Sequence, residues 1–314
     1  MGRTLEVAIG ALNGLVGDYL HRTRNGLATE MGFVRDGEVV GAAETGLSEV
    51  RGARRVVVLV HGLMSTEDVW RMDDGESYGS LLAADLGVAP IEVRFNSGLR
   101  ISENGERLDA LLSGLVDGAS IEEIWLLGHS MGGLVIRSAC HSAAERGSEW
   151  LGRAKKAFYI GSPHLGAPLE RAGNVVTWAL AKIEHPITAL VAEIANLRSV
   201  GVKDLRYGNL RREDWEGSEV DALLTNRRHP VPLLPHIRHH LVVGTLSADL
   251  ESKMLFGDLL VPVRSAAGRA REKDRAPPFP QEHVAILPGM SHLRLAHDRA
   301  VYAKIKAWAE EPLP

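Results

Sequence analysis

The chain has little of several things that define protein classes. Among its 314 residues there is one cysteine, Cys140, so no intrachain disulfide can form. A single cysteine fits a protein of a reducing compartment. Charge of one sign is not in excess either, because 36 Lys and Arg are balanced by 40 Asp and Glu. The basic surface typical of proteins that bind nucleic acid or anionic membranes is therefore not expected.

Long hydrophobic runs are also missing. No stretch reaches the roughly 18 apolar residues that a membrane-spanning helix needs, so no transmembrane segment is predicted. Asp18, His21, Arg22 and Arg24 interrupt every apolar run near the N-terminus, so no secretion signal is predicted. Since 45% of the residues are hydrophobic, the chain can still bury a large core. We expect one cytoplasmic domain that spans residues 1–314.

The most informative stretch is residues 124–134, which reads Ile-Trp-Leu-Leu-Gly-His-Ser-Met-Gly-Gly-Leu. A short apolar run, then Gly-x-Ser-x-Gly, then apolar residues at helical spacing predict a strand, a sharp turn and a helix. A serine at such a turn has a strained backbone and needs small neighbours, which Gly128 and Gly132 provide. We predict that Ser130 is a nucleophile. The alternative is a serine that only caps a helix after a glycine-rich turn.

Apolar patterning predicts alternating strands and helices around this motif. Strands are expected at 55–60, 91–95, 124–129, 156–161, 241–246 and 283–287, helices over 5–20, 81–86, 106–116 and 298–308, and a hairpin over 32–40 that turns at Asp36-Gly37. This order predicts an α/β fold, with a mostly parallel central sheet and helices on both faces.

Residues 169–236 interrupt the alternation. Apolar stripes at 176–183 and 187–197 predict helices, and no strand pattern follows before Leu241. We expect a helical cap inserted over the carboxyl edge of the sheet. Ordinary crossover helices are the alternative.

The strand at 55–60 runs into His61-Gly62, a sequence that suits a loop turned toward the nucleophile. The backbone N–H groups of Leu63 and Met131 are therefore the expected oxyanion-hole donors. We expect His61 to hold this loop rather than to transfer protons.

A serine hydroxyl is a weak nucleophile until an adjacent base removes its proton. His292 lies on the loop after the last predicted strand, where such a base is expected. His297 is a weaker candidate, because it stands at the mouth of the terminal helix. His283 begins the last strand and so belongs to the opposite edge of the sheet.

The acid that orients the base should follow the strand at 241–246. Asp249 is nearer to that strand, whereas Asp258 precedes a Leu-Leu-Val-Pro turn that would hold it rigidly. Both remain candidates on this reasoning. The histidines show no metal-ligand spacing, and His239 and His240 should face opposite sides of a strand, so we predict no metal and no cofactor.

Five ordered segments resemble bacterial α/β-hydrolases of the lipase and esterase kind, closest to the branch similar to GPI inositol-deacylases and triacylglycerol lipases. They are Val60-His61-Gly62-Leu63, Gly128-His129-Ser130-Met131-Gly132-Gly133, Gly161-Ser162-Pro163-His164-Leu165-Gly166-Ala167-Pro168, Gly257-Asp258-Leu259-Leu260-Val261-Pro262 and Ser291-His292-Leu293. The resemblance extends from about residue 56 to residue 309. It implies the α/β-hydrolase fold.

The same resemblance implies a catalytic triad of Ser130, Asp258 and His292, and so favours Asp258 over Asp249. The expected activity is that of a serine carboxylesterase or lipase-like hydrolase acting on small-molecule esters. The predicted cap and the 5% aromatic content favour short-to-medium acyl chains. An acyltransferase or a thioesterase could use the same triad, and a non-catalytic ligand-binding protein on this fold is a further alternative.

Overall fold

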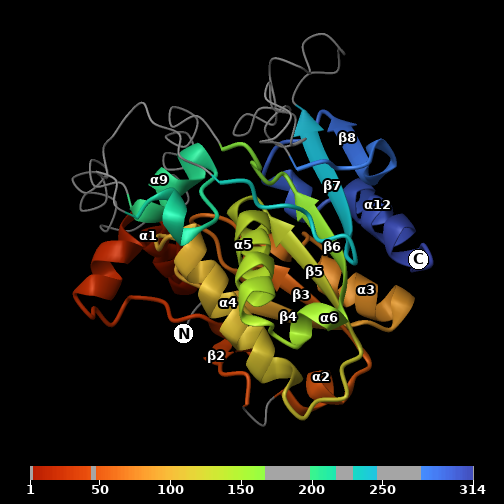
Figure 1. Ribbon diagram of the computed structural model, residues 1–314, viewed down its shortest axis with the longest axis horizontal. Coiled ribbons are helices and arrows are strands. Elements are labelled where there is room, and N and C mark those ends of the chain that lie inside the picture. The colour runs from red at the N-terminus through yellow and green to blue at the C-terminus, as the bar shows by residue number, and fades with distance from the viewer. Residues whose placement is uncertain (1–2, 44–46, 167–198, 217–228, 246–276, 314) are drawn as a thin grey trace.

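An eight-stranded sheet runs through the centre of the computed structural model, which describes residues 3–43, 47–166, 199–216, 229–245 and 277–313 (Figure 1). Its strands are β1 (Gly32–Arg35), β2 (Glu38–Val40), β3 (Arg55–Val60), β4 (Ala89–Arg94), β5 (Glu123–His129), β6 (Ala154–Ile160), β7 (Arg238–Thr245) and β8 (Val284–Pro288). They are arranged in the order β2-β1-β4-β3-β5-β6-β7-β8. Each of the predicted strands is present.

The sheet is mostly parallel, as the alternating pattern predicted. Every neighbouring pair from β4 through β3, β5, β6 and β7 to β8 is parallel, whereas β1 is antiparallel to both β2 and β4. The predicted hairpin joins β1 to β2, with positive φ values of 51° at Asp36 and 82° at Gly37. Two positive φ values in succession characterise the turn that suits the right-handed twist of a hairpin.

Helices cover both faces of the sheet. They are α1 (Arg3–Arg22), α2 (Ser48–Gly52), α3 (Tyr78–Leu86), α4 (Ile101–Val116), α5 (Met131–Arg146), α6 (Trp150–Arg153), α9 (Val200–Tyr207) and α12 (Arg299–Glu310), with short 3-10 helices η2 (Glu67–Trp70), η3 (Arg212–Asp214), η5 (Gln281–His283) and η6 (Arg294–Ala296). The predicted helices correspond to α1, α3, α4 and α12. The carboxylate of Asp298 accepts a hydrogen bond from Ala300 N and caps α12, as expected.

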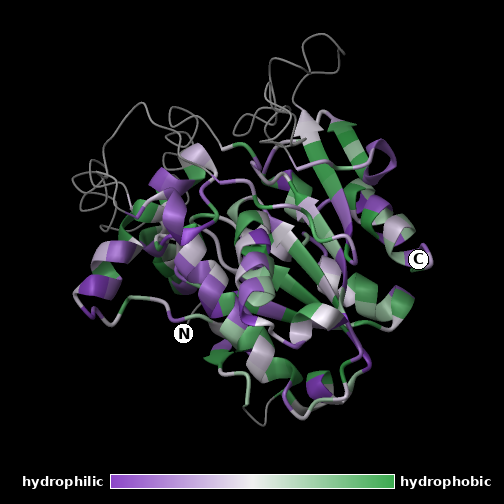
Figure 2. Ribbon diagram, in the orientation of Figure 1, coloured by the Kyte–Doolittle hydropathy of each residue, from purple (hydrophilic) through white to green (hydrophobic). Residues whose placement is uncertain are grey.

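Alternate side chains of the central strands enter two separate cores. On β3, Val56, Val58 and Val60 pack with α1, α4 and α5, while Val57 and Leu59 pack with α3 and α12 on the other face. Because both faces of this strand are buried, its sequence is an unbroken apolar run. Figure 2 shows the hydrophobic colour concentrated along these inner strands.

The helix that begins at the Gly-x-Ser-x-Gly turn is held in place by a buried carboxylate. Asp109 on α4 accepts hydrogen bonds from Ser142 Oγ of α5 at 2.9 Å and from Trp150 Nε1 at 2.8 Å. A buried acceptor that is satisfied in this way fixes the helices it joins. Asp109 therefore ties α5 to both α4 and α6.

The predicted cap over residues 169–236 is described only at 199–216 and 229–236. These parts include α9, which contacts α1 and α4. Arg100 Nη1 donates to the buried Asp204 carboxylate of α9 at 2.8 Å. The apolar stripes at 176–183 and 187–197 lie outside the described residues, so the cap itself stays a prediction.

Within the part of the chain that the structure describes, none of the helices combines the length and the hydrophobicity needed to cross a membrane.

Candidate active site

Ser130 occupies the sharp turn between β5 and α5. Its backbone angles, φ 53° and ψ −121°, lie in a region that residues other than glycine rarely adopt. The backbone N–H of Ser130 donates to Ile160 O of the neighbouring strand β6 at 2.8 Å, which anchors the turn to the sheet. The predicted strand–turn–helix is confirmed, with Ser130 at its apex.

The glycines of the motif permit backbones to approach closely. A Cβ atom on Gly132 would lie 2.1 Å from Val60 O, and one on Gly128 would lie 2.6 Å from Gly133 N. Neither neighbour is a side chain that could move aside. The spacing of these glycines is thus a packing requirement of the turn.

The loop after β3 lies directly beside the serine. A Cβ atom on Gly62 would be 3.1 Å from Ser130 Cβ. His61 Nδ1 lies 2.9 Å from Gly62 O, and Phe95 N donates to His61 Nε2 at 3.3 Å. Burial lowers the pKa of His61 to about 4, so the ring is neutral near pH 7. These contacts support the structural role that we expected for His61.

Leu63 belongs to the loop after β3, and Met131 directly follows Ser130 at the start of α5. Leu63 follows Gly62, and the next residue, Met64, has a positive φ of 57° and donates its N–H to Ser97 Oγ at 3.0 Å. Met131 is the first residue of α5, so its N–H has no partner within the helix. Both residues stand where oxyanion donors are expected, and that role stays a prediction.

His292 reaches the same edge of the sheet from the loop after β8. Its ring packs against Gly161, where a Cβ atom would lie 3.1 Å from His292 Nδ1. Gly161 directly follows Ile160, whose carbonyl holds Ser130. Ser130 is 7% exposed and His292 is 4% exposed. Ser130 and His292 therefore both lie against the end of β6, at Ile160 and Gly161 respectively, and both are largely shielded from water.

His129 is a site residue that the sequence did not reveal. Its Nε2–H donates to the backbone carbonyl of His292 at 3.0 Å, across 163 positions of sequence. The two rings also contact each other, with centroids 4.9 Å apart. Burial, reinforced by the nearby His292, lowers the pKa of His129 well below its ordinary value, so the ring is neutral. Its place next to Ser130 in the motif was the only signal.

The loop that carries His292 is fixed to two other segments. Tyr78 on α3 donates its hydroxyl to Leu295 O at 2.7 Å and accepts from Asp298 N at 2.9 Å. His297, the weaker candidate for the base, has its Nδ1 3.2 Å from Val69 O of η2. These contacts fix the backbone on the C-terminal side of His292.

The turn after β6 lies at the same carboxyl edge of the sheet. His164 N donates to Ser162 O at 3.0 Å, and Gly166 N donates to Pro163 O at 2.8 Å. These two hydrogen bonds fold residues 162–166 into a tight turn. Ala167 and Pro168 lie outside the described residues.

Three candidates for the base and the acid remain. His283 lies at the opposite edge of the sheet, and Asp249 and Asp258 lie outside the described residues. His283 precedes the amino end of β8, whereas Ser130 and His292 follow the carboxyl ends of parallel strands. His283 is therefore at the opposite edge, as predicted. Asp249 and Asp258 both lie outside the described residues, so the identity of the acid stays a prediction.

A strained serine after a central parallel strand, with a histidine loop beside it, is the arrangement of one family. The model of the alpha/beta hydrolase family matches residues 57–305. The chain belongs to this family. The α/β-hydrolase fold suggested by the five sequence segments is thereby confirmed, while the narrower branch is not tested. A search of curated protein sequences gives no significant match.

Solved structures share the fold of this α/β-hydrolase at low identity. The mature form of the Bacillus licheniformis lipase BlEst2 is 16% identical over 82% of this chain and 92% of that chain, with a TM-score of 0.51. Its propeptide form is 15% identical over 82% of this chain and 51% of that chain, with a TM-score of 0.54. A Pyrococcus furiosus esterase is 14% identical over 82% of this chain and 80% of that chain, with a TM-score of 0.44. The two likenesses to BlEst2, with TM-scores above 0.5, bear on the fold and not on the substrate.

Replacing Gly132 with alanine should destabilise the turn. The new Cβ would lie 2.1 Å from Val60 O, and relieving that overlap requires the backbone to shift. We expect the free energy of unfolding, measured by urea denaturation, to fall by about 3 kcal/mol. Gly152→Ala is the matched control, because no atom lies within 4 Å of the added Cβ. Equal stability of the two variants would show that the turn does not need glycine at position 132.

Proposed function

We propose that the protein is a serine carboxylesterase that hydrolyses small-molecule carboxylic esters through an acyl-enzyme on Ser130. The observation that supports this proposal is that Ser130 and His292 contact two successive residues at the carboxyl end of β6. Ser130 sits on a strained turn bonded to Ile160, and the ring of His292 lies against the next residue, Gly161. A nucleophile and a base need this proximity for acyl transfer.

In the first half of the reaction, Ser130 Oγ attacks the ester carbonyl and His292 accepts the serine proton. The oxyanion that forms would be stabilised by the backbone N–H groups of Leu63 and Met131. His292 then donates its proton to the departing alcohol, and the acyl group stays on Ser130. Because Gly62 packs against Ser130, the Leu63 loop is held close enough to take part.

In the second half, His292 removes a proton from water, which attacks the acyl-enzyme. Collapse of the second tetrahedral intermediate returns the proton to Ser130 and releases the carboxylic acid. Asp258 would hold the imidazole in the correct tautomer and stabilise the imidazolium, with Asp249 as the alternative. His129 supports this step by donating its Nε2–H to the His292 backbone carbonyl, and it takes up no further proton because its ring stays neutral.

We further propose that the substrates carry short-to-medium acyl chains. Ser130 and His292 are almost fully buried, so access to them is narrow. With 5% aromatic residues, the chain has few of the large apolar side chains that hold a lid on an oil surface. A cap over 169–236 that packs over a modest cleft would favour soluble esters.

Ser130→Ala should abolish ester hydrolysis. We expect kcat for a chromogenic ester to fall at least about 10⁴-fold, since members of a triad act as a unit. A fluorophosphonate should label Ser130 in the parent protein, detected by peptide mass spectrometry, and should leave the variant unlabelled. Ser120→Ala, on the exposed segment before β5, is the matched control and should retain the parent rate. Turnover by the Ser130→Ala variant would eliminate this serine as the nucleophile.

The two candidate acids can be separated by isosteric amides. Asp258→Asn should lower kcat about 10⁴-fold, because the amide favours the wrong imidazole tautomer. Asp249→Asn should change kcat little. Circular dichroism of both variants checks that they fold. The reverse pattern would transfer the role to Asp249.

Acyl-chain preference tests the substrate proposal. Soluble butyrate and hexanoate esters should be turned over faster than emulsified long-chain triglyceride, without a jump in rate where the substrate forms an interface. Product analysis with added glycerol separates hydrolysis from acyl transfer, and we expect free acid as the product. Faster turnover of the emulsion would point instead to a lipase acting at an oil surface.

A further inference from the structure

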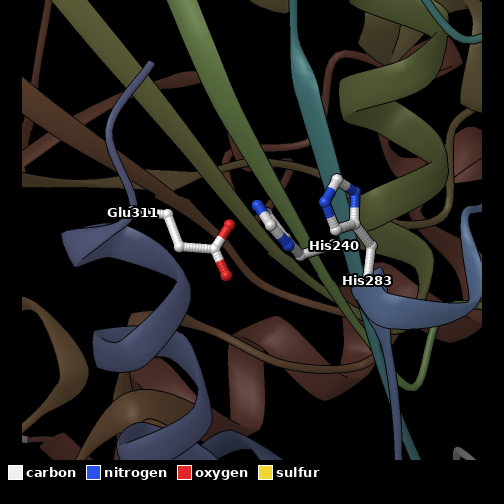
Figure 3. Close-up of side chains that lie close together, drawn as sticks. All are labelled: His240, His283 and Glu311. Carbon is white, nitrogen blue, oxygen red and sulfur yellow. The ribbon is translucent and has the colours of Figure 1, made fainter. Parts of the chain in front are cut away.

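A second cluster of ionisable side chains lies at the amino edge of the sheet, away from Ser130. His240 stands near the start of β7, His283 ends η5 just before β8, and Glu311 follows the last turn of α12 (Figure 3). Each offers one ligand atom, and these three atoms lie within 4.8 Å of one another. We propose that these three residues bind a divalent transition metal of the Zn²⁺ class, which fastens the C-terminal helix to β7 and to the edge strand β8.

The His240 ring lies in an environment that suits a metal ligand. Its side chain is fully buried, yet neither ring nitrogen has a hydrogen-bond partner among the described residues. Buried polar atoms are nearly always paired, so two unpaired nitrogens on one ring need an explanation. The ring is stacked on Phe158 and Trp308, with centroids 5.2 and 4.8 Å away, which fixes its plane. A coordinated metal would satisfy one of these nitrogens.

The two imidazoles and the carboxylate also suit a transition metal chemically. His240 and His283 each offer an imidazole nitrogen, and the neutral imidazole is the commonest metal ligand in proteins. Two imidazoles and one carboxylate are a common donor set for zinc, with water in the fourth position. The His240 and His283 rings already lie with centroids 4.4 Å apart.

The geometry allows closure around an ion. Zinc bonds to nitrogen and oxygen of roughly 2 Å place the ligand atoms of a tetrahedral site about 3.4 Å apart. Because the ligand atoms lie within 4.8 Å of one another, they must approach by up to about 1.4 Å. The His240 ring is held by stacking between Phe158 and Trp308. His283 and Glu311 are half-buried, so their side chains have room to change rotamer. Figure 3 shows the Glu311 carboxylate directed toward the His240 ring.

Two cations also face Glu311 and shape the site. Arg238 Nη1 donates to Glu311 Oε2 at 3.0 Å, and Lys156 Nζ donates to the backbone oxygen of Glu311 at 2.7 Å. Arg238 occupies only one of the two carboxylate oxygens of Glu311. Repulsion of the metal by Arg238 and Lys156 limits the affinity, so we expect binding in the micromolar range rather than tighter.

A metal held by these three residues would link β7, β8 and the C-terminal end of α12. His283 immediately precedes β8, and the carboxyl end of β8 leads to the loop of His292. Glu311 ends the helix whose residues Val301 and Ile305 pack beneath the sheet. A metal here would stabilise the strand and helix on either side of that loop without touching the reacting atoms.

The test uses the full chain, stripped with a chelator and titrated with Zn²⁺ by calorimetry and with Co²⁺ by visible absorption. We expect one saturable equivalent, cobalt bands of a low-coordinate site, and a rise in Tm of roughly 5 °C at a hundredfold excess over Kd. His283→Gln and Glu311→Gln should each weaken binding at least about tenfold. These two half-buried positions are chosen in place of the fully buried His240, because substitutions at them disturb the fold less.

Matched controls come from the adjacent exposed positions, Glu282→Gln and Glu310→Gln, which should bind the metal as the parent does. Ser130→Ala should also bind normally, so loss of ester hydrolysis and loss of metal binding are independent results. Absence of saturable binding would overturn the proposal. So would equal affinity in the His283→Gln, Glu311→Gln and control variants.

Discussion

The close approach of backbones at Ser130 is the constraint on which the site depends. Gly132 lies against the carbonyls of Val60 and His61, and Gly62 lies against Ser130 itself. These contacts press three segments together: the end of β3, the end of β5 and the start of α5. The positive φ of Ser130 persists because the surrounding sheet fixes it through Ile160 O. The strain at one residue is thus maintained by packing around it.

The direction of the strands organises the rest of the molecule. Because β3 to β8 are parallel, the loops that follow them share one edge, where Ser130 and His292 meet. The segments that precede the strands share the other edge, where His240 and His283 meet. The two edges therefore receive separate sets of histidines. β8 connects them, with His283 before it and the His292 loop after it.

Much of this arrangement could be predicted from local sequence. The unbroken apolar run of β3 required burial on both faces, and the Asp36-Gly37 pair required a tight hairpin turn. Gly-x-Ser-x-Gly predicted the strained serine because the motif carries its own steric explanation. His292 was predicted from its place after the last strand. In each case a short stretch of residues contains the whole physical cause.

The sequence by itself determined the strands, the main helices, the parallel direction of the central strands and the position of Ser130, because periodicity and glycine spacing act over a few residues. Only the tertiary structure decided how distant side chains pair. His129 reaches the His292 carbonyl across 163 positions, and Tyr78 holds the same loop from α3. His240 looked like an isolated strand residue until folding placed it between His283 and Glu311. Such contacts depend on the register and crossing of whole elements, and no local pattern records them.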